Sequence, residues 1–283
     1  MDSLMAKINE SPLKQRWTSI CKNKLLRFAV GELFGSYILL MGTQASGFGK
    51  YGIVAGGLSC FFTLSVLIEI LAPVSNAQLN PAITPLFYLF RGQTLYQSLV
   101  SIAAQFIGGF MGVLTLNGFY TDKLIVFSNV EHSFKLAISE FIGSTLLGFV
   151  LMIATHRKKH IPFLVAGIIT AGVFIIPSCM IVNPMITVMR MFMNVTFSIN
   201  PLMVLYVCIA EFLGFFVGAI LAEFVVVEGE KDLYSNIDEE TPNTENKMKP
   251  IGELPDEPIE LPNIEKAAII NDDTKTQVSN QIS

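Results

Sequence analysis

Six long apolar segments constrain the fold of this chain more than any other feature. A helix needs about 20 mostly apolar residues to cross the hydrocarbon core of a bilayer. Inside that core every backbone N–H and C=O must find a partner within the protein, which favours helices. The sequence therefore predicts an all-α membrane protein with six transmembrane helices, at residues 25–45, 51–72, 95–117, 134–155, 161–178 and 201–227.

Two further apolar stretches, residues 81–90 and 184–193, are about half as long as a transmembrane helix. Each follows an Asn-Pro pair, in which Asn caps the free N–H groups of a helix and Pro occupies its first turn. Irregular backbone at membrane depth is tolerated only where it is buried in protein or lines a cavity. The two stretches are predicted to be re-entrant half-helices whose Asn-Pro turns meet at an aqueous path.

The chain contains an internal repeat. Residues 28–36 match residues 136–144 without a gap, and residues 104–108 match residues 210–214. The offsets are 108 and 106 residues, and the two Asn-Pro pairs between them are 103 residues apart. Such a repeat indicates two similar structural units.

Each unit holds three predicted spans, so the second unit must be inverted in the membrane relative to the first. Inverted repeats that bring broken helices to the midplane are typical of transport proteins. We therefore expect a channel-like domain at residues 25–227, with repeats at about 25–117 and 134–227.

Charge separates this domain from the end of the chain. Residues 1–226 hold 14 basic and 9 acidic side chains, a net charge of +5, whereas residues 227–283 hold 5 and 14, a net charge of −9. An acidic segment with few apolar residues stays solvated. We expect a cytoplasmic N-terminal segment at residues 1–24 and a disordered cytoplasmic tail at residues 228–283.

Basic residues also predict the orientation. They cluster before the first span and again at Arg157, Lys158 and Lys159, between the fourth and fifth spans. Cytoplasmic loops carry an excess of Lys and Arg. Both termini are therefore predicted to be cytoplasmic, and we favour the plasma membrane over an internal membrane.

Glu32 and Glu140 occupy equivalent positions in the first and fourth spans. A carboxylate inside the membrane is costly and needs partners. Two interpretations are a proton relay and a structural brace that accepts hydrogen bonds from the half-helix loops. The symmetry of the two residues matches that of the loops and favours the brace.

With these motifs the chain resembles the aquaporin and glycerol-facilitator family, the major intrinsic proteins. The similarity lies in AVGE at 29–32, ISEF at 138–141, NAQLNPAIT at 76–84 and NPM at 183–185, where the family usually has Ala in place of Met. The resemblance covers residues 25–227. It identifies as the pore motif the residues Asn80, Pro81, Ala82, Asn183, Pro184 and Met185.

The resemblance implies a passive pore in each subunit of a homotetramer, for water and small uncharged solutes. The facing half-helices would oppose ions and protons. We expect no cofactor, no metal and no nucleic-acid partner, since the four cysteines are scattered and form no metal-binding pattern. The lipid bilayer is the expected surrounding.

Counting from the two Asn residues as in the family places the constriction at Cys60, Ala171, Met180 and Ile186. Water-selective members usually have Phe, His, a small residue and Arg at these positions. Arg190, one turn beyond Ile186 on the same face, is within reach of the outer vestibule, and of the two roles we favour an interfacial anchor. Two interpretations remain open: a wide filter that also passes glycerol, or a pore closed by Met180.

Asn194-Val195-Thr196 matches the acceptor pattern for N-glycosylation, on a loop predicted to lie outside. Three other function classes were weighed against the channel. A poorly conducting structural or junctional protein on the same scaffold remains an alternative. A secondary transporter is disfavoured because the spans offer no coupling-ion site beyond the two glutamates. An enzyme is disfavoured because no catalytic residues, metal cluster or phosphate-binding loop can be identified.

Overall fold

The structure is a computed structural model that describes residues 19, 22–49 and 52–226. Within this part of the chain the regular elements are all helices, which confirms the predicted all-α fold. The long helices are α3 (Lys24–Gln44), α4 (Gly52–Ser75), α6 (Leu95–Tyr120), α7 (Lys135–His156), α8 (Ile161–Ile175) and α10 (Pro201–Val225). The short helices are α5 (Thr84–Phe90) and α9 (Pro184–Met189), with 3-10 turns η1 (Ala45–Phe48) and η2 (Arg190–Phe192).

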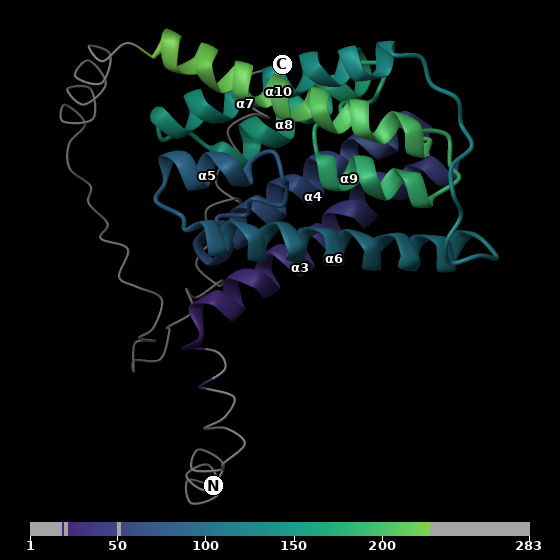
Figure 1. The fold of residues 1–283 in the computed structure, drawn as a ribbon, viewed down its shortest axis with the longest axis horizontal. Coiled ribbons are helices and arrows are strands. Elements are labelled where there is room, and N and C mark those ends of the chain that lie inside the picture. The colour runs from purple at the N-terminus through teal and green to yellow at the C-terminus, as the bar shows by residue number, and fades with distance from the viewer. Residues whose placement is uncertain (1–18, 20–21, 50–51, 227–283) are drawn as a thin grey trace, which may run out of the picture. The chain divides into compact units, whose positions relative to one another are not determined.

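The two halves have the same arrangement of helices. In the first half α3 packs against α6 and α5 contacts α6, and in the second half α7 packs against α10 and α9 contacts α10. The halves meet where α4 contacts α8 and where α6 contacts α9. In Figure 1 the short helices α5 and α9 lie between the α7–α10 pair, at the top, and the α3–α6 pair, at the bottom.

Glycines bring the helices of each pair close together. A Cβ built on Gly108 of α6 would overlap the carbonyl oxygen of Leu33 on α3. Gly214 of α10 has the same relation to Phe141 on α7. Small residues let helix backbones approach closely inside a membrane. The repeat seen in the sequence is therefore also a repeat of helix packing.

Five of the six long helices are long and apolar enough to cross a membrane, and α8 is shorter. Its 15 residues rise about 22 Å, less than the hydrocarbon thickness of about 30 Å. The predicted span at 161–178 is three residues too long. The helix ends at Ile175 because Ile176 is extended, with φ −99° and ψ 131°, and precedes Pro177, which disfavours the helical conformation before it.

The first half-helix also begins later than predicted, at Thr84 instead of residue 81. Residues 81–83 form a turn, in which the backbone oxygen of Asn80 accepts hydrogen bonds from the N–H groups of Ile83 and Thr84, each at 3.1 Å. The second half-helix begins at Pro184 with Asn183 as its cap, as predicted. The segment at 228–283 and most of residues 1–24 lie outside the described residues, so their roles stay predictions.

Candidate pore and its supports

The two re-entrant loops share an unusual backbone. Each loop has three non-glycine residues in the left-handed conformation, at a cost of roughly 1–2 kcal/mol per residue. The spacing between equivalent residues is 103 positions, the same as between the two Asn-Pro pairs. These residues are Asn76, Ala77 and Leu79 in the first loop, with φ of 63°, 47° and 51°, and Cys179, Met180 and Val182 in the second, with φ of 61°, 49° and 44°.

Glu32 and Glu140 lie directly behind these strained segments, and both side chains are fully buried. Each carboxylate accepts two backbone N–H groups, at 2.7–3.0 Å: Gln78 and Leu79 donate to Glu32, and Ile181 and Val182 donate to Glu140. These hydrogen bonds are the ones that a brace requires. They stabilise a loop conformation that the backbone alone disfavours.

Two serines, not identified from the sequence, complete the loops. The hydroxyl oxygen of Ser75 accepts the N–H of Ala77, and that of Ser178 accepts the N–H of Met180, each at 3.3 Å. Their spacing is again 103 positions, so the sequence contained a readable signal for this pair.

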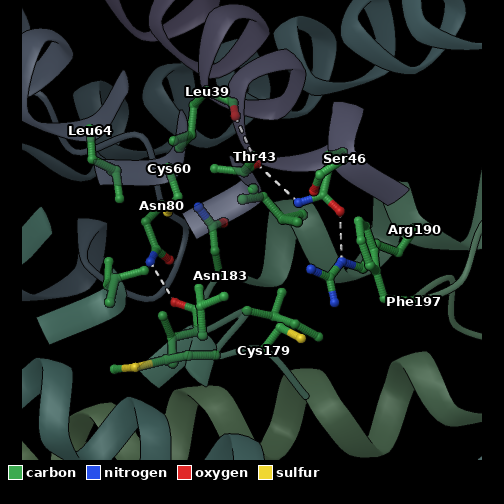
Figure 2. A pocket seen from close by; sticks show the side chains of 18 of the residues that line it. Leu39, Thr43, Ser46, Cys60, Leu64, Asn80, Cys179, Asn183, Arg190 and Phe197 are labelled. Atoms are coloured by element: carbon green, nitrogen blue, oxygen red, sulfur yellow. Dashed lines mark hydrogen bonds between the residues drawn. The ribbon is translucent and has the colours of Figure 1, made fainter. Parts of the chain in front are cut away.

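The two pore asparagines, labelled in Figure 2, each donate a hydrogen bond to the opposite loop. Asn80 donates from Nδ2 to the backbone oxygen of Val182 at 2.7 Å, and Asn183 donates from Nδ2 to that of Leu79 at 2.9 Å. Oδ1 of Asn80 accepts the N–H of Ala82 at 2.9 Å, in the turn before α5, and Oδ1 of Asn183 caps α9 by accepting the N–H of Met185 at 3.1 Å. Each amide nitrogen carries a second hydrogen, and both side chains line the cavity.

A cavity of about 390 Å³ extends past this asparagine pair. Its lining comes from α3, α4, α8 and both re-entrant loops. Along α4 it runs from Gly52 to Ile68, which is about 24 Å of helix axis. An elongated cavity with two half-helix loops at its wall has the form of a pore through the bundle.

Three of the four predicted constriction residues, Cys60, Met180 and Ile186, line this cavity. The prediction for Ala171 is wrong, because its side chain is exposed and is absent from the lining. The face of α8 that lines the cavity carries Val165, Ile169 and Val173, four residues apart. Ala171 lies on the opposite face, since residues two positions apart on a helix point in different directions.

The two methionines at altered family positions pack against glycines. A Cβ on Gly172 of α8 would overlap the sulfur of Met180, so this side chain lies against the wall of the cavity. Met185 is fully buried outside the lining, where its sulfur occupies the space that a Cβ on Gly109 of α6 would need. The Met in place of Ala in the second motif therefore fills a gap beside α6.

Arg190 is not an interfacial anchor, which corrects the prediction. Its side chain is only 5% exposed and lines the cavity. Nε donates to Oε1 of Gln44 at 2.8 Å (Figure 2). Nη1 donates to the backbone oxygen of Ser178 at 3.3 Å. The guanidinium carbon lies 4.7 Å from the ring centroid of Phe197. No sequence signal linked these residues, which come from four separate segments.

Asn194 is exposed, as a glycosylated asparagine must be, and its glycosylation stays a prediction. No group of three or more metal-ligating side chains occurs within residues 19, 22–49 and 52–226.

Comparison with known proteins gives a consistent result. The family model of the major intrinsic proteins matches residues 19–225. The chain is 27% identical over 200 residues to aquaglyceroporin AqpS of Rhizobium meliloti, covering 67% of this chain and 86% of that protein. It is 26% identical over 232 residues to probable aquaporin NIP4-2 of Arabidopsis thaliana, covering 74% of this chain and 79% of that protein. The structure of the aquaglyceroporin from Plasmodium falciparum has a similar fold, with a TM-score of 0.54 at 18% identity, covering 74% of this chain and 99% of that one.

Proposed function

This chain belongs to the major intrinsic protein family, a family of channels and not of enzymes, and we propose that it conducts water and glycerol-sized uncharged solutes while excluding ions and protons. The observation that carries the proposal is the cavity whose wall holds both Asn80 and Asn183, each with one amide hydrogen left for a solute.

The asparagine pair supports conduction of water without conduction of protons. A water molecule beside both amides accepts their hydrogens through its oxygen, so its own hydrogens point away along the cavity. Neighbouring waters on the two sides are then oriented in opposite senses. A chain of waters with such a break does not relay protons, and the N–H groups of the two half-helices add positive potential at the same point.

The composition of the wall supports exclusion of cations. Among the described residues that line the cavity there is no Asp or Glu, and Arg190 is a fixed positive charge. A cation that enters must lose most of its hydration shell, and the apolar residues along α4 and α8 cannot replace it.

The predicted solute range is wider than water. Cys60, Met180, Ile186 and Val173 are apolar and aliphatic or sulfur-containing, and the aromatic side chain in the described lining is Phe197, beside Arg190. Two relatives bear the name aquaglyceroporin, which agrees with passage of glycerol. We propose the wide filter over a pore closed by Met180, because the Met180 side chain packs on Gly172.

Stopped-flow light scattering on vesicles that contain the purified full-length chain tests the function. We expect water flux above that of empty vesicles, measurable glycerol uptake, and no dissipation of a proton gradient. Water flux without glycerol uptake would contradict the wide filter. Absence of both fluxes in folded protein would support the alternative, a poorly conducting structural or junctional membrane protein.

Three further features belong to the same proposal. We propose a homotetramer, with one pore in each subunit, in the plasma membrane. We also propose that both termini are cytoplasmic, because Arg157, Lys158 and Lys159 follow α7 directly. Protease added outside intact cells should leave the 228–283 segment uncleaved, and cleavage there would reverse the orientation.

A further inference from the structure

Arg190, Gln44 and Phe197 form a built cluster at the cavity wall, away from the positions at which the family pattern places its filter. We propose that this cluster is the specificity-determining site of the channel: Arg190 rejects cations by its charge and binds solute hydroxyl groups by its free N–H donors. The proposal rests on the proposed channel function.

The position of Arg190 follows from the second half-helix. It lies four residues after Ile186, and residues four apart on a helix share a face. Both therefore line the same cavity, with Arg190 one turn farther from Asn183. The helix continues through this turn as η2, so the arginine side chain is placed on a continuous helical surface.

Gln44, the last residue of α3, fixes the direction of the guanidinium group. Its side chain is 1% exposed, and its Nε2 donates to the hydroxyl of Thr43 at 3.0 Å. That hydroxyl in turn donates to the backbone oxygen of Leu39 at 2.7 Å. This chain of hydrogen bonds leaves Oε1 of Gln44 as the acceptor for Nε of Arg190, as Figure 2 shows.

Phe197 provides an apolar surface beside the guanidinium. A Cβ on Gly47 of η1 would overlap the Phe197 ring, so the absence of a side chain there makes room for the aromatic group. The neighbouring backbone is joined by the N–H of Thr196, which donates to the oxygen of Gly47 at 3.4 Å. A cation beside an aromatic face is stabilised without neutralisation of its charge.

The charge of Arg190 is not paired at short range. Its contacts among the described residues are an amide oxygen, a carbonyl oxygen and an aromatic ring, and no carboxylate there lies within salt-bridge distance. The guanidinium has five N–H donors, of which two donate to residues that the structure describes. Donors beside an apolar ring suit a small polyol, which presents hydroxyl oxygens and a carbon chain together.

Three substitutions distinguish the effect of the positive charge of Arg190 from the effect of its N–H donors. Arg190→Ala removes both. Arg190→Lys keeps the charge but loses the planar set of donors. Gln44→Glu keeps an acceptor for Nε and places a negative charge beside the guanidinium. The matched control is Arg91→Ala, because Arg91 is an exposed arginine next to the other half-helix and lies outside the cavity lining.

Each full-length variant is incorporated into vesicles, and water flux, glycerol uptake and K⁺ efflux are measured after its folded state is verified by size-exclusion chromatography. Arg190→Ala and Gln44→Glu should raise K⁺ efflux relative to water flux by about tenfold or more, since the repulsion of a cation is lost. Arg190→Lys should keep K⁺ excluded and lower the ratio of glycerol uptake to water flux by about tenfold. Arg91→Ala should behave as the unmodified chain.

The outcomes distinguish this inference from the function on which it rests. If the unmodified chain conducts and both Arg190→Ala and Gln44→Glu keep its solute and K⁺ selectivity, the inference is wrong and the channel function stands. If Arg190→Ala fails to fold, the ratios of Arg190→Lys and Gln44→Glu decide by the same criterion. If the unmodified chain conducts neither water nor glycerol, both proposals are wrong.

Discussion

The two re-entrant loops have the same backbone, but the third span of each half supports it differently. In the first half Gln105 of α6 donates to Glu32 at 2.8 Å and to the hydroxyl of Thr84 at 3.2 Å. In the second half the equivalent residue of α10 is Glu211, which can only accept hydrogen bonds as a carboxylate. It accepts the N–H of Asn183 at 3.1 Å and the hydroxyl of Thr187 at 2.6 Å.

This difference shows what the repeat has retained. The left-handed residues, the loop serines and the first-span glutamates are kept in both halves, because the strained backbone needs the same N–H groups satisfied. The third-span residue has changed from a donor that supports the glutamate to an acceptor that holds the half-helix itself. The pore therefore depends on the loop geometry, which two different sets of side chains produce.

The largest expected effect comes from breaking the contact between the halves. Asn80→Leu and Asn183→Leu should each abolish water flux and destabilise the fold by about 2–6 kcal/mol, because each leaves a capped N–H and a loop carbonyl unsatisfied in a buried site. Both variants should be affected alike, since each amide holds the opposite loop. Vesicle flux and thermal unfolding in detergent measure this.

Asn194→Leu is the control for that pair, since Asn194 is exposed and outside the cavity lining. Normal conduction by Asn80→Leu would contradict the hourglass arrangement of the two loops.

A smaller effect should distinguish the two braces. Glu32→Gln should lower the unfolding temperature more than Glu140→Gln. Oε2 of Glu32 accepts the N–H of Leu79, Nε2 of Gln105 and the hydroxyl of Ser101, so an amide there loses an acceptor that faces three donors. Oε2 of Glu140 accepts the N–H of Val182, and the α10 residue Glu211 donates nothing to it. Equal shifts in the unfolding temperature would mean that α6 adds nothing to the first brace.

Exchanging the third-span residues tests the asymmetry directly. Gln105→Glu should destabilise the chain, because it places a second carboxylate against Glu32 and removes two donated hydrogen bonds. Glu211→Gln should cost less, about 1 kcal/mol or under, since the amide oxygen can still accept from Asn183 and Thr187. Denaturation of the two variants side by side measures the difference, and the reverse order would show that the two supports are interchangeable.

The sequence predicted the parts of this molecule that depend on local pattern. Apolar length indicated the spans, Asn-Pro pairs indicated the half-helices, and the repeat related Glu32 to Glu140. The bounds were less accurate where loop backbone replaced helix, as at Pro177 and at residues 81–83. The end of α8 follows from the extended Ile176 before Pro177, and the late start of α5 follows from the turn closed by the backbone oxygen of Asn80. A hydropathy pattern contains neither.

The filter was the least predictable part. Counting from Asn183 assumes that α8 has the family's length and rotation, and this assumption placed Ala171 in the pore. Gln44 lies 146 positions from Arg190 in the chain, and Phe197 lies beyond the end of η2, so neither contact follows from helical spacing. A charged residue in an otherwise apolar half-helix was the one available signal, and its burial could not be inferred from its position.

The smallest expected effect compares the two faces of α8, the helix of the second half that contacts α4 across the cavity. Ala171→Phe should leave water and glycerol flux unchanged, because Ala171 lies on the exposed face of α8. Val173→Phe adds the same ring on the face that lines the cavity, and it should reduce glycerol uptake by about tenfold with a smaller loss of water flux. Both variants add the same ring to the same helix and are measured by stopped-flow light scattering. They therefore differ mainly in the face of α8 on which the ring lies. A strong reduction by Ala171→Phe with none by Val173→Phe would mean that α8 presents its other face to the pore and that the family count was correct.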